Sequence, residues 1–352
     1  MCAKRILVAP LGWGLGHATR CIPLVEELLR AGAEPWLASD GRALHLLRRE
    51  FPDLPLLELP SYPIRYFSDH MVLNVATRSH GLLAAIWREN RLVQRWVREH
   101  RFDALLSDNR FGCFVPGLPS IFLTHQLFIR TPRQALDWAV RQLNHRFIRQ
   151  FSECWVPDYP DLPNLSGRLS HGATRLPHSF IGPLSRMQTL ERPQRYDVAV
   201  VLSGPEPQRT RLEQTLLRQA STLPLRWLFV QGLTEERQQW RRQDQIDLCN
   251  FMSSGELNEA LAASRIVVCR SGYSSIMDLA VLGKKAVLIP TPGQTEQEYL
   301  AQRLYRHKLF YTQSQAQLDL SRALVEVERY PGFSQLELGR GLLKEKVRQL
   351  AD

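Results

Sequence analysis

The sequence predicts two doubly wound, Rossmann-like α/β domains that face a central cleft. The chain of 352 residues is too long for one ordinary hydrophobic core and suits two domains. In each half, short apolar runs alternate with segments of helical periodicity, which is typical of βαβ units and a parallel sheet. Between the halves, residues 179–186 (SFIGPLSR) combine glycine and proline and indicate a linker. Open sheets of this kind bind ligands at the carboxyl ends of their strands.

The first half begins with a short apolar strand that runs into a glycine-rich loop and an amphipathic helix. A second strand and helix follow directly, and two longer helices come before the linker. The predicted strands are residues 5–10, 35–39, 103–107 and 120–124, and the predicted helices are residues 18–31, 42–50, 82–100 and 132–151. The apolar runs are of strand length, and the longer segments repeat their apolar residues with the helical period.

The alternation of strand and helix starts again after the linker, with an apolar strand at residues 196–202 (YDVAVVL). Further strands are predicted at residues 226–230, 246–252, 265–269 and 286–289, and the C-terminal stretch 336–350 is helical. We therefore divide the chain into an N-terminal domain, a C-terminal domain and a final helix, at residues 1–183, 184–335 and 336–352.

Composition restricts the classes of protein that fit. Hydrophobic residues make up 44% of the chain, but no stretch approaches the roughly 20 apolar residues that span a bilayer. The first strand is too short for a secretory signal, so we expect a cytoplasmic protein. The six cysteines show no paired or metal-ligand spacing, which argues against a disulfide framework and against a metal site. The net charge of +10 favours phosphate-bearing ligands or an anionic membrane surface. No nucleic-acid-binding motif is present, so nucleic acid is not an expected partner.

The first glycine loop (LGWGLGHATR) lies between a strand and a helix and contains Gly12, Gly14 and Gly16. Glycine permits close backbone approach to a ligand, and a helix N-terminus offers free N–H groups. His17 stands at the helix start, where a neutral imidazole can take a proton from an attacking hydroxyl. A tight turn and a capping histidine are the structural alternatives. Arg20 is either a phosphate contact or a surface arginine. The G-x-G-x-G spacing differs from that of dinucleotide sites, so no dinucleotide cofactor is indicated.

Two loops of the second half also follow a strand and open a helix. In the first (SGPEPQRT), Ser203, Gly204 and the backbone amides after them can cradle a phosphate, and Arg209 can add a charge-assisted hydrogen bond. In the second (RSGYSSIMD), Ser271 and Gly272 present amides where a diphosphate binds. A simple turn is the alternative for the first of these loops.

Further polar residues are expected at the same edge of the second domain. Asp278 comes about two turns into its helix, where a carboxylate can accept hydrogen bonds from both ribose hydroxyls; a solvated helix acid is the alternative. The turn PTPGQTEQ carries amides and carboxylates that suit sugar hydroxyls, namely Gln294, Thr295, Glu296 and Gln297.

These motifs together resemble glycosyltransferases of the GT-B fold, in particular the family 28 type that includes the N-acetylglucosaminyltransferases of the peptidoglycan lipid precursor. The resemblance is strongest over residues 251–301, which contain CRSGYSSIMDLAVLGKKAVLIPTPGQTEQEYLA. It implies that the backbone of Met252 contacts the base, that Ser271 and Gly272 lie near the diphosphate and that Asp278 holds the ribose. It also implies that Gln297 and Glu298 reach the donor sugar, that His17 faces the acceptor, and that the last helix crosses back to the first domain.

The sequence departs from that family at two of these positions. Asp278 stands where a glutamate holds the ribose, and Glu298 stands where the family has a second glutamine. The loop SGPEPQRT is also unlike the glycine-rich loop of the family. The donor sugar is therefore open between a hexose and an N-acetylhexosamine.

We therefore expect an inverting glycosyltransferase that moves a sugar from a UDP-sugar to a hydroxyl acceptor. No acidic pair is placed to hold a metal at the diphosphate, so neither a metal nor another cofactor is expected. A UDP-sugar hydrolase of the same fold and a non-catalytic sugar-nucleotide-binding partner subunit are the alternatives. A non-hydrolysing epimerase is disfavoured, because the first loop lacks the basic start of that group.

The acceptor side carries the basic excess of the chain. Residues 86–151 hold eleven arginines against five acids. The predicted helix 132–151 combines an apolar stripe, which we assign to the core, with a face that carries Trp138, Arg141, His145 and Arg149. Arginine beside an exposed aromatic ring suits an anionic bilayer, here the inner face of the membrane, and a lipid-linked or glycan acceptor. An ordinary solvated basic face is the alternative. The candidate residues on the acceptor side are Gly14, Gly16, Asp108, Asn109 and His125.

Overall fold

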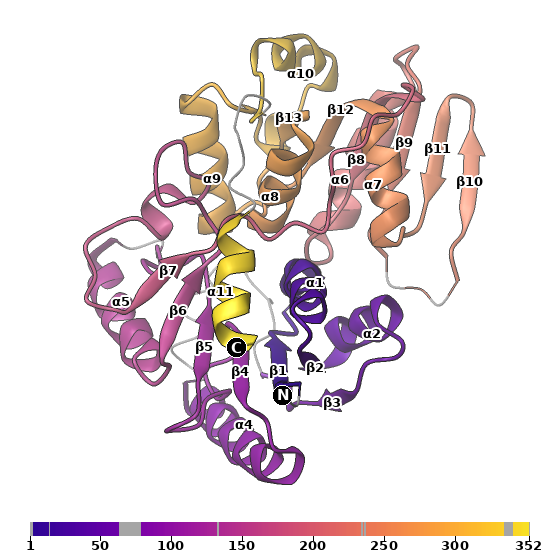
Figure 1. The fold of residues 1–352 in the computed structure, drawn as a ribbon. Helices are drawn as coiled ribbons and strands as arrows, with labels where there is room; N and C mark the ends of the chain where they lie inside the picture. Colours follow the sequence, from indigo (N-terminus) through magenta and orange to yellow (C-terminus); the bar gives the residue numbers. More distant parts are fainter. Residues whose placement is uncertain are drawn as a thin grey trace. The chain divides into compact units, whose positions relative to one another are not determined.

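The computed structural model describes residues 3–13, 15–62, 79–131, 134–233, 235, 237–333 and 341–351. The chain divides into two compact units (Figure 1). Unit 1 comprises Met1–Leu184 and Leu338–Asp352, and unit 2 comprises Ser185–Glu337. Gly14, which the sequence places among the acceptor-side residues, lies outside the described residues.

Unit 1 is built on a sheet in the order β3-β2-β1-β4-β5-β6-β7, in which all pairs are parallel. The strands are β1 (Arg5–Pro10), β2 (Glu34–Ser39), β3 (Leu56–Glu58), β4 (Ala104–Asp108), β5 (Ser120–Leu123), β6 (Glu153–Val156) and β7 (His178–Phe180). The strand order reverses between β1 and β4, and open α/β sheets bind ligands at such a switch point. The loops that follow β1, β4 and β5 therefore form the expected functional edge of unit 1.

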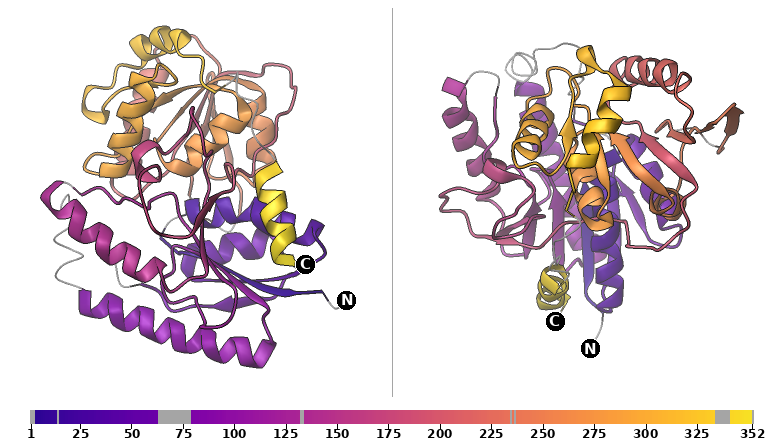
Figure 2. Two further views of the ribbon diagram at one scale, coloured as in Figure 1. Left: turned by 60° about the vertical axis from the view of Figure 1, so that its left-hand side comes forward. Right: turned by 90° about the horizontal axis from the view of Figure 1, so that it is seen from above.

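Helices cover both faces of this sheet (Figure 2). On one face lie α1 (Leu15–Arg30) and α2 (Gly41–Glu50), and on the other lie α4 (Ser79–His100) and α5 (Gln134–Ile148). Helix α1 buries residues with helical spacing, among them Ala18, Cys21, Val25 and Leu28. Helix α4 packs Val93 and Trp96 against Leu7 and Leu105 of the central strands.

Unit 2 is built on a second sheet, in the order β10-β11-β9-β8-β12-β13-β14. Its strands are β8 (Tyr196–Val201), β9 (Trp227–Val230), β10 (Trp240–Gln243), β11 (Ile246–Cys249), β12 (Ser264–Cys269), β13 (Lys285–Leu288) and β14 (Tyr311–Thr312). Only the pair of β10 and β11 is antiparallel among the described strands. Strands β8, β12 and β13 are neighbours at its centre, and their apolar residues are buried on both faces, as in other parallel sheets.

The helices of unit 2 are α6 (Gln208–Ala220), α7 (Ser254–Ala262), α8 (Tyr273–Leu282), α9 (Thr295–Arg306) and α10 (Leu320–Glu326). Short 3₁₀ turns lie at Gly167–Leu169 in unit 1 and at Gln315–Gln317 and Val327–Arg329 in unit 2. Ser253 begins α7 with a capping box, since it accepts from the Glu256 amide while the Glu256 carboxylate accepts from the Ser253 amide. Gly283 ends α8 in the left-handed conformation, with φ at 61°. None of the described helices combines the length and the apolar character needed to cross a membrane.

The C-terminal helix α11 (Gly341–Ala351) belongs to unit 1, although the chain reaches it through unit 2. It packs beside α1 (Figure 1). Lys346 of α11 forms an ion pair with Glu153 of β6 at 2.8 Å, and Lys4 donates to the carbonyl of Leu350 at 3.3 Å. These contacts tie the end of the chain to the N-terminal sheet.

The predicted core stripe of residues 132–151 holds at Phe151, which is 5% exposed, but is wrong at Leu136 and Leu143. Leu136 and Leu143 are 37% and 55% exposed, whereas Asn144 and His145 are each only 6% exposed. Asn144 and His145 are buried because both form hydrogen bonds with the backbone. Asn144 donates to the carbonyl of Gln126 at 3.1 Å, and His145 Nε2 donates to the carbonyl of Leu127 at 2.9 Å. The loop after β5 has buried carbonyls that need donors, and α5 turns its polar residues inward to supply them.

Candidate active site

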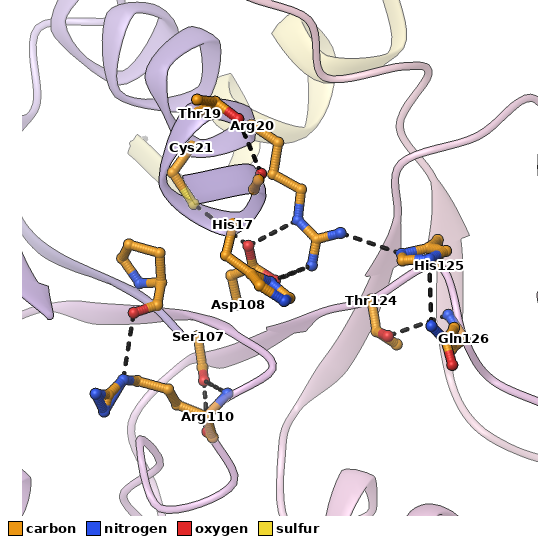
Figure 3. Close-up of polar contacts among 12 residues, drawn as sticks. His17, Thr19, Arg20, Cys21, Ser107, Asp108, Arg110, Thr124, His125 and Gln126 are labelled. Carbon is orange, nitrogen blue, oxygen red and sulfur yellow. Dashed lines mark hydrogen bonds and ion pairs between the residues drawn. The ribbon is translucent and has the colours of Figure 1, made fainter. Parts of the chain in front are cut away.

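The carboxyl edge of unit 1 brings together His17, Arg20, Asp108 and His125 (Figure 3). His17 and Arg20 lie in the first turns of α1, Asp108 is the last residue of β4, and His125 follows β5. Because β1, β4 and β5 are adjacent parallel strands, their carboxyl ends place these side chains at one edge. His17, Asp108 and His125 were predicted from the sequence as site residues, whereas the sequence left the role of Arg20 open.

Asp108 is the centre of this cluster. Its carboxylate is 1% exposed and lies 3.1 Å, through Oδ1, from His17 Nδ1. Arg20 Nε donates to Asp108 Oδ2 at 2.7 Å, and the NH2 group of Arg20 forms an ion pair with Oδ1. Although burial raises the pKa of a carboxyl, the charges of Arg20 and His17 hold the pKa of Asp108 below its usual range. Asp108 is therefore ionised throughout the neutral range.

Arg20 is not a surface residue. Its side chain is 2% exposed, and it binds Asp108 on one side and His125 Nδ1, at 3.1 Å, on the other. The sequence signal for this role was the spacing His17-x-x-Arg20, which puts both side chains on one face of the first helical turn. A buried acid at the end of β4 was not visible from that spacing.

The Nδ1 atom of His17 has two neighbours with opposite requirements. Asp108 Oδ1 can only accept a hydrogen bond, whereas the guanidinium of Arg20, at 2.9 Å, can only donate one. With the proton on Nδ1, His17 bonds to Asp108 and keeps a lone pair on Nε2. Among the described residues, Nε2 has no hydrogen-bond partner, and the side chain is 20% exposed. His17 can therefore act as a base at Nε2, with Asp108 orienting the ring and stabilising the imidazolium.

The other acceptor-side candidates shape the backbone. Asn109 has φ at 57°, a left-handed conformation that asparagine tolerates, and its amide donates to the carbonyl of Leu123 at 3.2 Å. Gly16 accepts from the hydroxyl of Thr19 at 3.0 Å in the first turn of α1. A side chain at Gly12 would overlap the carboxylate of Asp40, so the glycine loop has room only for glycine at that point.

In unit 2, the loops after β8, β12 and β13 lie side by side at the carboxyl edge of the sheet. Ser203 and Gly204 are exposed, and Gly204 has φ at 104°, which favours glycine. Gly272 is the N-cap of α8. The hydroxyl of Ser271 is buried and donates to the carbonyl of Gln297 at 2.8 Å, so only the backbone amide of Ser271 remains for an anion.

Three of the predicted donor contacts have structural partners of their own. Arg209 binds Glu206 at 2.6 Å and Glu213 at 2.8 Å, which ties α6 to its own loop. Gln297 is 7% exposed and accepts from the Thr291 amide at 2.9 Å. Glu298 accepts from the Gly293 amide at 2.9 Å. These roles could not be predicted from the sequence, because each depends on a partner in a turn whose geometry the residues alone do not specify.

The remaining donor-side candidates occupy the ends of two helices. Gln294 is the N-cap of α9, and Thr295 and Glu296 form its first turn, where all three side chains are half-buried. Met252 lies between β11 and α7 and is half-buried. Within the described residues, the backbone N–H and C=O of Met252 have no hydrogen-bond partner. An unpaired donor beside an unpaired acceptor suits the edge of a nucleobase.

Asp278 lies in the second turn of α8 and is half-buried. Its Oδ1 accepts from the hydroxyl of Ser185 at 2.6 Å. Burial raises the pKa of Asp278 to about 6, although the charge of Arg186 and the bond from Ser185 act in the opposite direction. The ionised form of Asp278 therefore costs free energy in the folded protein. A ligand that donates hydrogen bonds to the carboxylate would reduce this cost.

Replacement of Asp278 by asparagine is expected to stabilise the protein at neutral pH but not at pH 4. The folded carboxyl has a pKa of about 6 against 3.8 for an unshifted one, so stability falls as pH rises through this window and levels off above it. The shift corresponds to about 3 kcal/mol in the free energy of unfolding, which Asp278→Asn should largely recover at pH 7.5. Urea unfolding at both pH values measures this. An equal change in the free energy of unfolding at both pH values would show that burial does not disfavour the ionised carboxylate of Asp278.

No group of three or more His, Cys, Asp or Glu side chains placed to hold a metal occurs among the described residues. The five cysteines in that part of the chain are all buried and unpaired. Burial raises the pKa of Cys154 well above its ordinary range and that of Cys269 to about 12, so neither is a nucleophile near neutral pH.

Comparison with known proteins gives matches to a family model and to relatives that cover parts or most of the chain. Residues 208–334 match the glycosyltransferase family 28 C-terminal domain. An uncharacterized glycosyltransferase of Methanopyrus kandleri is 24% identical over 81% of this chain and 85% of its own length. A UDP-N-acetylglucosamine–N-acetylmuramyl-(pentapeptide) pyrophosphoryl-undecaprenol N-acetylglucosamine transferase of Methylobacterium sp. (strain 4-46) is 44% identical over 46 residues, 13% of this chain and 12% of its own.

The fold has counterparts among solved structures. The crystal structure of MurG from Acinetobacter baumannii superimposes with a TM-score of 0.62 at 12% identity, over 99% of both chains. At this identity the similarity concerns the fold.

Proposed function

The chain is a family 28-like glycosyltransferase of the GT-B fold, and from this premise we propose that it moves a hexose or an N-acetylhexosamine from a UDP-sugar to a hydroxyl acceptor. The transfer inverts the anomeric configuration and needs no metal. The observation that carries this proposal is the pair of His17 and Asp108, in which a buried carboxylate orients an imidazole whose Nε2 is unpaired among the described residues.

The proposed chemistry is a single displacement. His17 Nε2 takes the proton of the acceptor hydroxyl, and the hydroxyl oxygen forms the new bond to the anomeric carbon. The bond between that carbon and the diphosphate oxygen breaks, and UDP leaves with the electron pair. One displacement at one carbon inverts its configuration. Asp108 stabilises the imidazolium that forms on His17, because its carboxylate stays ionised.

The proposed donor residues belong to unit 2. The backbone of Met252 pairs with the base, Asp278 accepts from the ribose hydroxyls, and the amides of Ser271 and Gly272 at the start of α8 bind the diphosphate. A helix N-terminus stabilises the negative charge that develops on the leaving group. This source of positive potential supports the proposal that a divalent cation is not required.

The proposal is tested by a donor panel of UDP-, dTDP- and GDP-sugars. We expect a UDP-sugar to raise the melting temperature most, and transfer to persist in excess chelator. Complete loss of turnover in chelator, restored by Mg²⁺, would contradict the metal-independent mechanism. Free sugar released at full rate without an acceptor would identify a hydrolase, and binding without turnover across the panel would identify a partner subunit.

We propose further that the acceptor is lipid-linked and that unit 1 contacts an anionic membrane at its cytoplasmic face. Helices α4 and α5 cover the same face of the sheet (Figure 2), and both expose large apolar side chains. Trp87 and Trp138 are 58% and 65% exposed. The guanidinium of Arg91 lies 4.3 Å from the centre of the Trp87 ring. The outward turn of Leu136 and Leu143 in α5 adds apolar surface beside exposed arginines.

Trp138→Ala is expected to weaken binding to vesicles that contain anionic lipid by roughly tenfold, because an interfacial tryptophan contributes about 1–2 kcal/mol through its buried area. Vesicle cosedimentation at low salt measures this. Trp240→Ala is the matched control: Trp240 is 50% exposed on β10 of unit 2, and its loss should leave binding unchanged. Equal effects of the two substitutions, or no binding by the unaltered protein, would contradict the proposed surface.

A further inference from the structure

Arg270 is a buried cation that has no acidic partner among the described residues. Its side chain is 1% exposed. It donates to the carbonyls of Ile289 and Pro290, each at 3.2 Å, and to that of Gln208 at 2.9 Å, while its Nε has no partner. Burial lowers the pKa of Arg270 to about 10, which leaves it charged at neutral pH. A positive charge therefore stands uncompensated inside unit 2.

This charge lies where three loops meet. Arg270 directly follows β12, Ile289 and Pro290 follow β13, and Gln208 begins α6 after β8. Because β8, β12 and β13 are adjacent and parallel, their carboxyl ends lie together. The hydrogen bonds of Arg270 hold the three loops to one another. The N-termini of α6 and α8 add their own positive potential to the same edge.

The hydroxyl of Thr291, in the loop after β13, is buried and has no hydrogen-bond partner among the described residues. The residue is 4% exposed, and its Oγ1 has no hydrogen-bond partner. Its backbone is fully used, since its amide donates to Gln297 Oε1 at 2.9 Å and its carbonyl accepts from the Gln294 amide at 3.1 Å. A buried polar group left unpaired is costly and indicates a missing partner.

The unpaired hydroxyl of Thr291 lies beside Gly204, and the side-chain amide of Gln297 lies beside Gly272. Thr291 Oγ1 is 3.6 Å from the point that a Cβ on Gly204 would occupy, and Gln297 Nε2 is 3.9 Å from the same point on Gly272. Gln297 links the two sides, because its other amide atom accepts from Thr291. Each of the two glycines therefore has a side-chain donor beside it, and the hydrogen bond between Thr291 and Gln297 joins the two loops.

We propose that Thr291 and Arg270 complete a diphosphate seat between Gly204 and Gly272. The Thr291 hydroxyl donates a hydrogen bond to a phosphate oxygen, and Arg270, which does not touch the ligand, positions the loops and supplies positive potential from behind them. This arrangement does for the leaving diphosphate what a divalent cation does in metal-dependent enzymes. The inference rests on the proposed function in one respect, namely that the ligand is a nucleoside diphosphate.

The test compares binding of uridine, UMP and UDP by titration calorimetry. Thr291→Val keeps the shape of the side chain and removes only the hydroxyl, and it should lower the preference for UDP over uridine by about tenfold. Arg270→Met should lower the same preference by roughly tenfold or more, with uridine binding unchanged. Thr222→Val is the matched control, because Thr222 is exposed beyond the C-terminus of α6, and its hydroxyl donates to the carbonyl of Gln219 at 2.8 Å.

The outcomes distinguish failure of the proposed diphosphate seat from failure of the proposed nucleotide donor. Loss of the preference for UDP in Thr291→Val, with uridine binding and the melting temperature retained, supports the seat. An unchanged preference in Thr291→Val overturns it, even where Arg270→Met fails to fold. An unaltered protein that binds neither UMP nor UDP removes the nucleotide donor, and the proposed function and the seat fall together.

Discussion

His17→Ala is expected to lower turnover by about 10²–10⁴ while leaving the affinity for UDP unchanged. The histidine is the only described imidazole of the cluster whose Nε2 is unpaired, and Asp108 holds its ring from the other nitrogen at 3.1 Å. Alanine removes the proton acceptor and nothing that the proposed donor residues of unit 2 require. The measurement is kcat for transfer at saturating donor, together with the dissociation constant of UDP.

The matched control for this substitution is His45→Ala. His45 is exposed on α2, away from the cluster, so its loss should leave both turnover and UDP affinity as they are. A near-normal rate in His17→Ala would remove His17 from the role of base and direct attention to His125, which is linked to the same carboxylate through Arg20. A parallel loss of UDP affinity would instead indicate a general structural defect.

Asp108→Asn is expected to affect both catalysis and stability. Asparagine keeps the size of the side chain but not the charge that holds the His17 ring and stabilises its imidazolium, and turnover should fall by up to about 10⁴. The guanidinium of Arg20, 2% exposed, would lose the carboxylate of Asp108 and remain charged in the interior. Breaking a buried ion pair on one side costs about 3–5 kcal/mol in the free energy of unfolding. Urea unfolding and kcat below the melting transition measure the two effects separately.

Glu89→Gln distinguishes loss of stability from loss of catalysis. Glu89 is 0% exposed and pairs with the buried guanidinium of Arg110 at 2.7 Å in the same unit, without contact to His17 in the described structure. We expect a comparable loss of stability with normal turnover. Asp108→Asn with normal turnover would mean that Asp108 serves only the fold and that the pair with His17 is not catalytic.

The central strands of both sheets and the helices beside them could be predicted from the sequence to within a few residues. They are long apolar runs or strongly periodic segments, and β1 was predicted with its observed bounds, Arg5–Pro10. The outer strands β3, β6, β7, β10 and β14 were not predicted. They have two to four residues each, and such short segments take their conformation from the neighbouring strand more than from their own pattern.

Helix α5 illustrates why periodicity alone misassigned a face. The spacing of Leu136, Val140, Leu143 and Phe147 is that of a buried stripe, yet the helix is turned so that Asn144 and His145 reach the loop after β5. The carbonyls of that loop are invisible to any pattern within the helix. Satisfying them decided the rotation of α5, and this rotation exposes the apolar residues that we assign to the membrane surface.

The sequence by itself determined the α/β class, the glycine loops that follow the strands, and His17 and Asp278 as the residues to examine. These follow from local rules, since periodicity, glycine and helix ends act within a few residues. Only the tertiary structure decided which side chains form hydrogen bonds or ion pairs within the fold, such as those of Arg209 and Gln297, and which keep polar groups available to a ligand. It placed Asp108 against His17 across 91 residues of chain, and it left Arg270 charged and Thr291 unpaired. The physical reason is that burial and the supply of hydrogen-bond partners depend on strands far apart in the sequence, whose carboxyl ends meet only in the folded sheet.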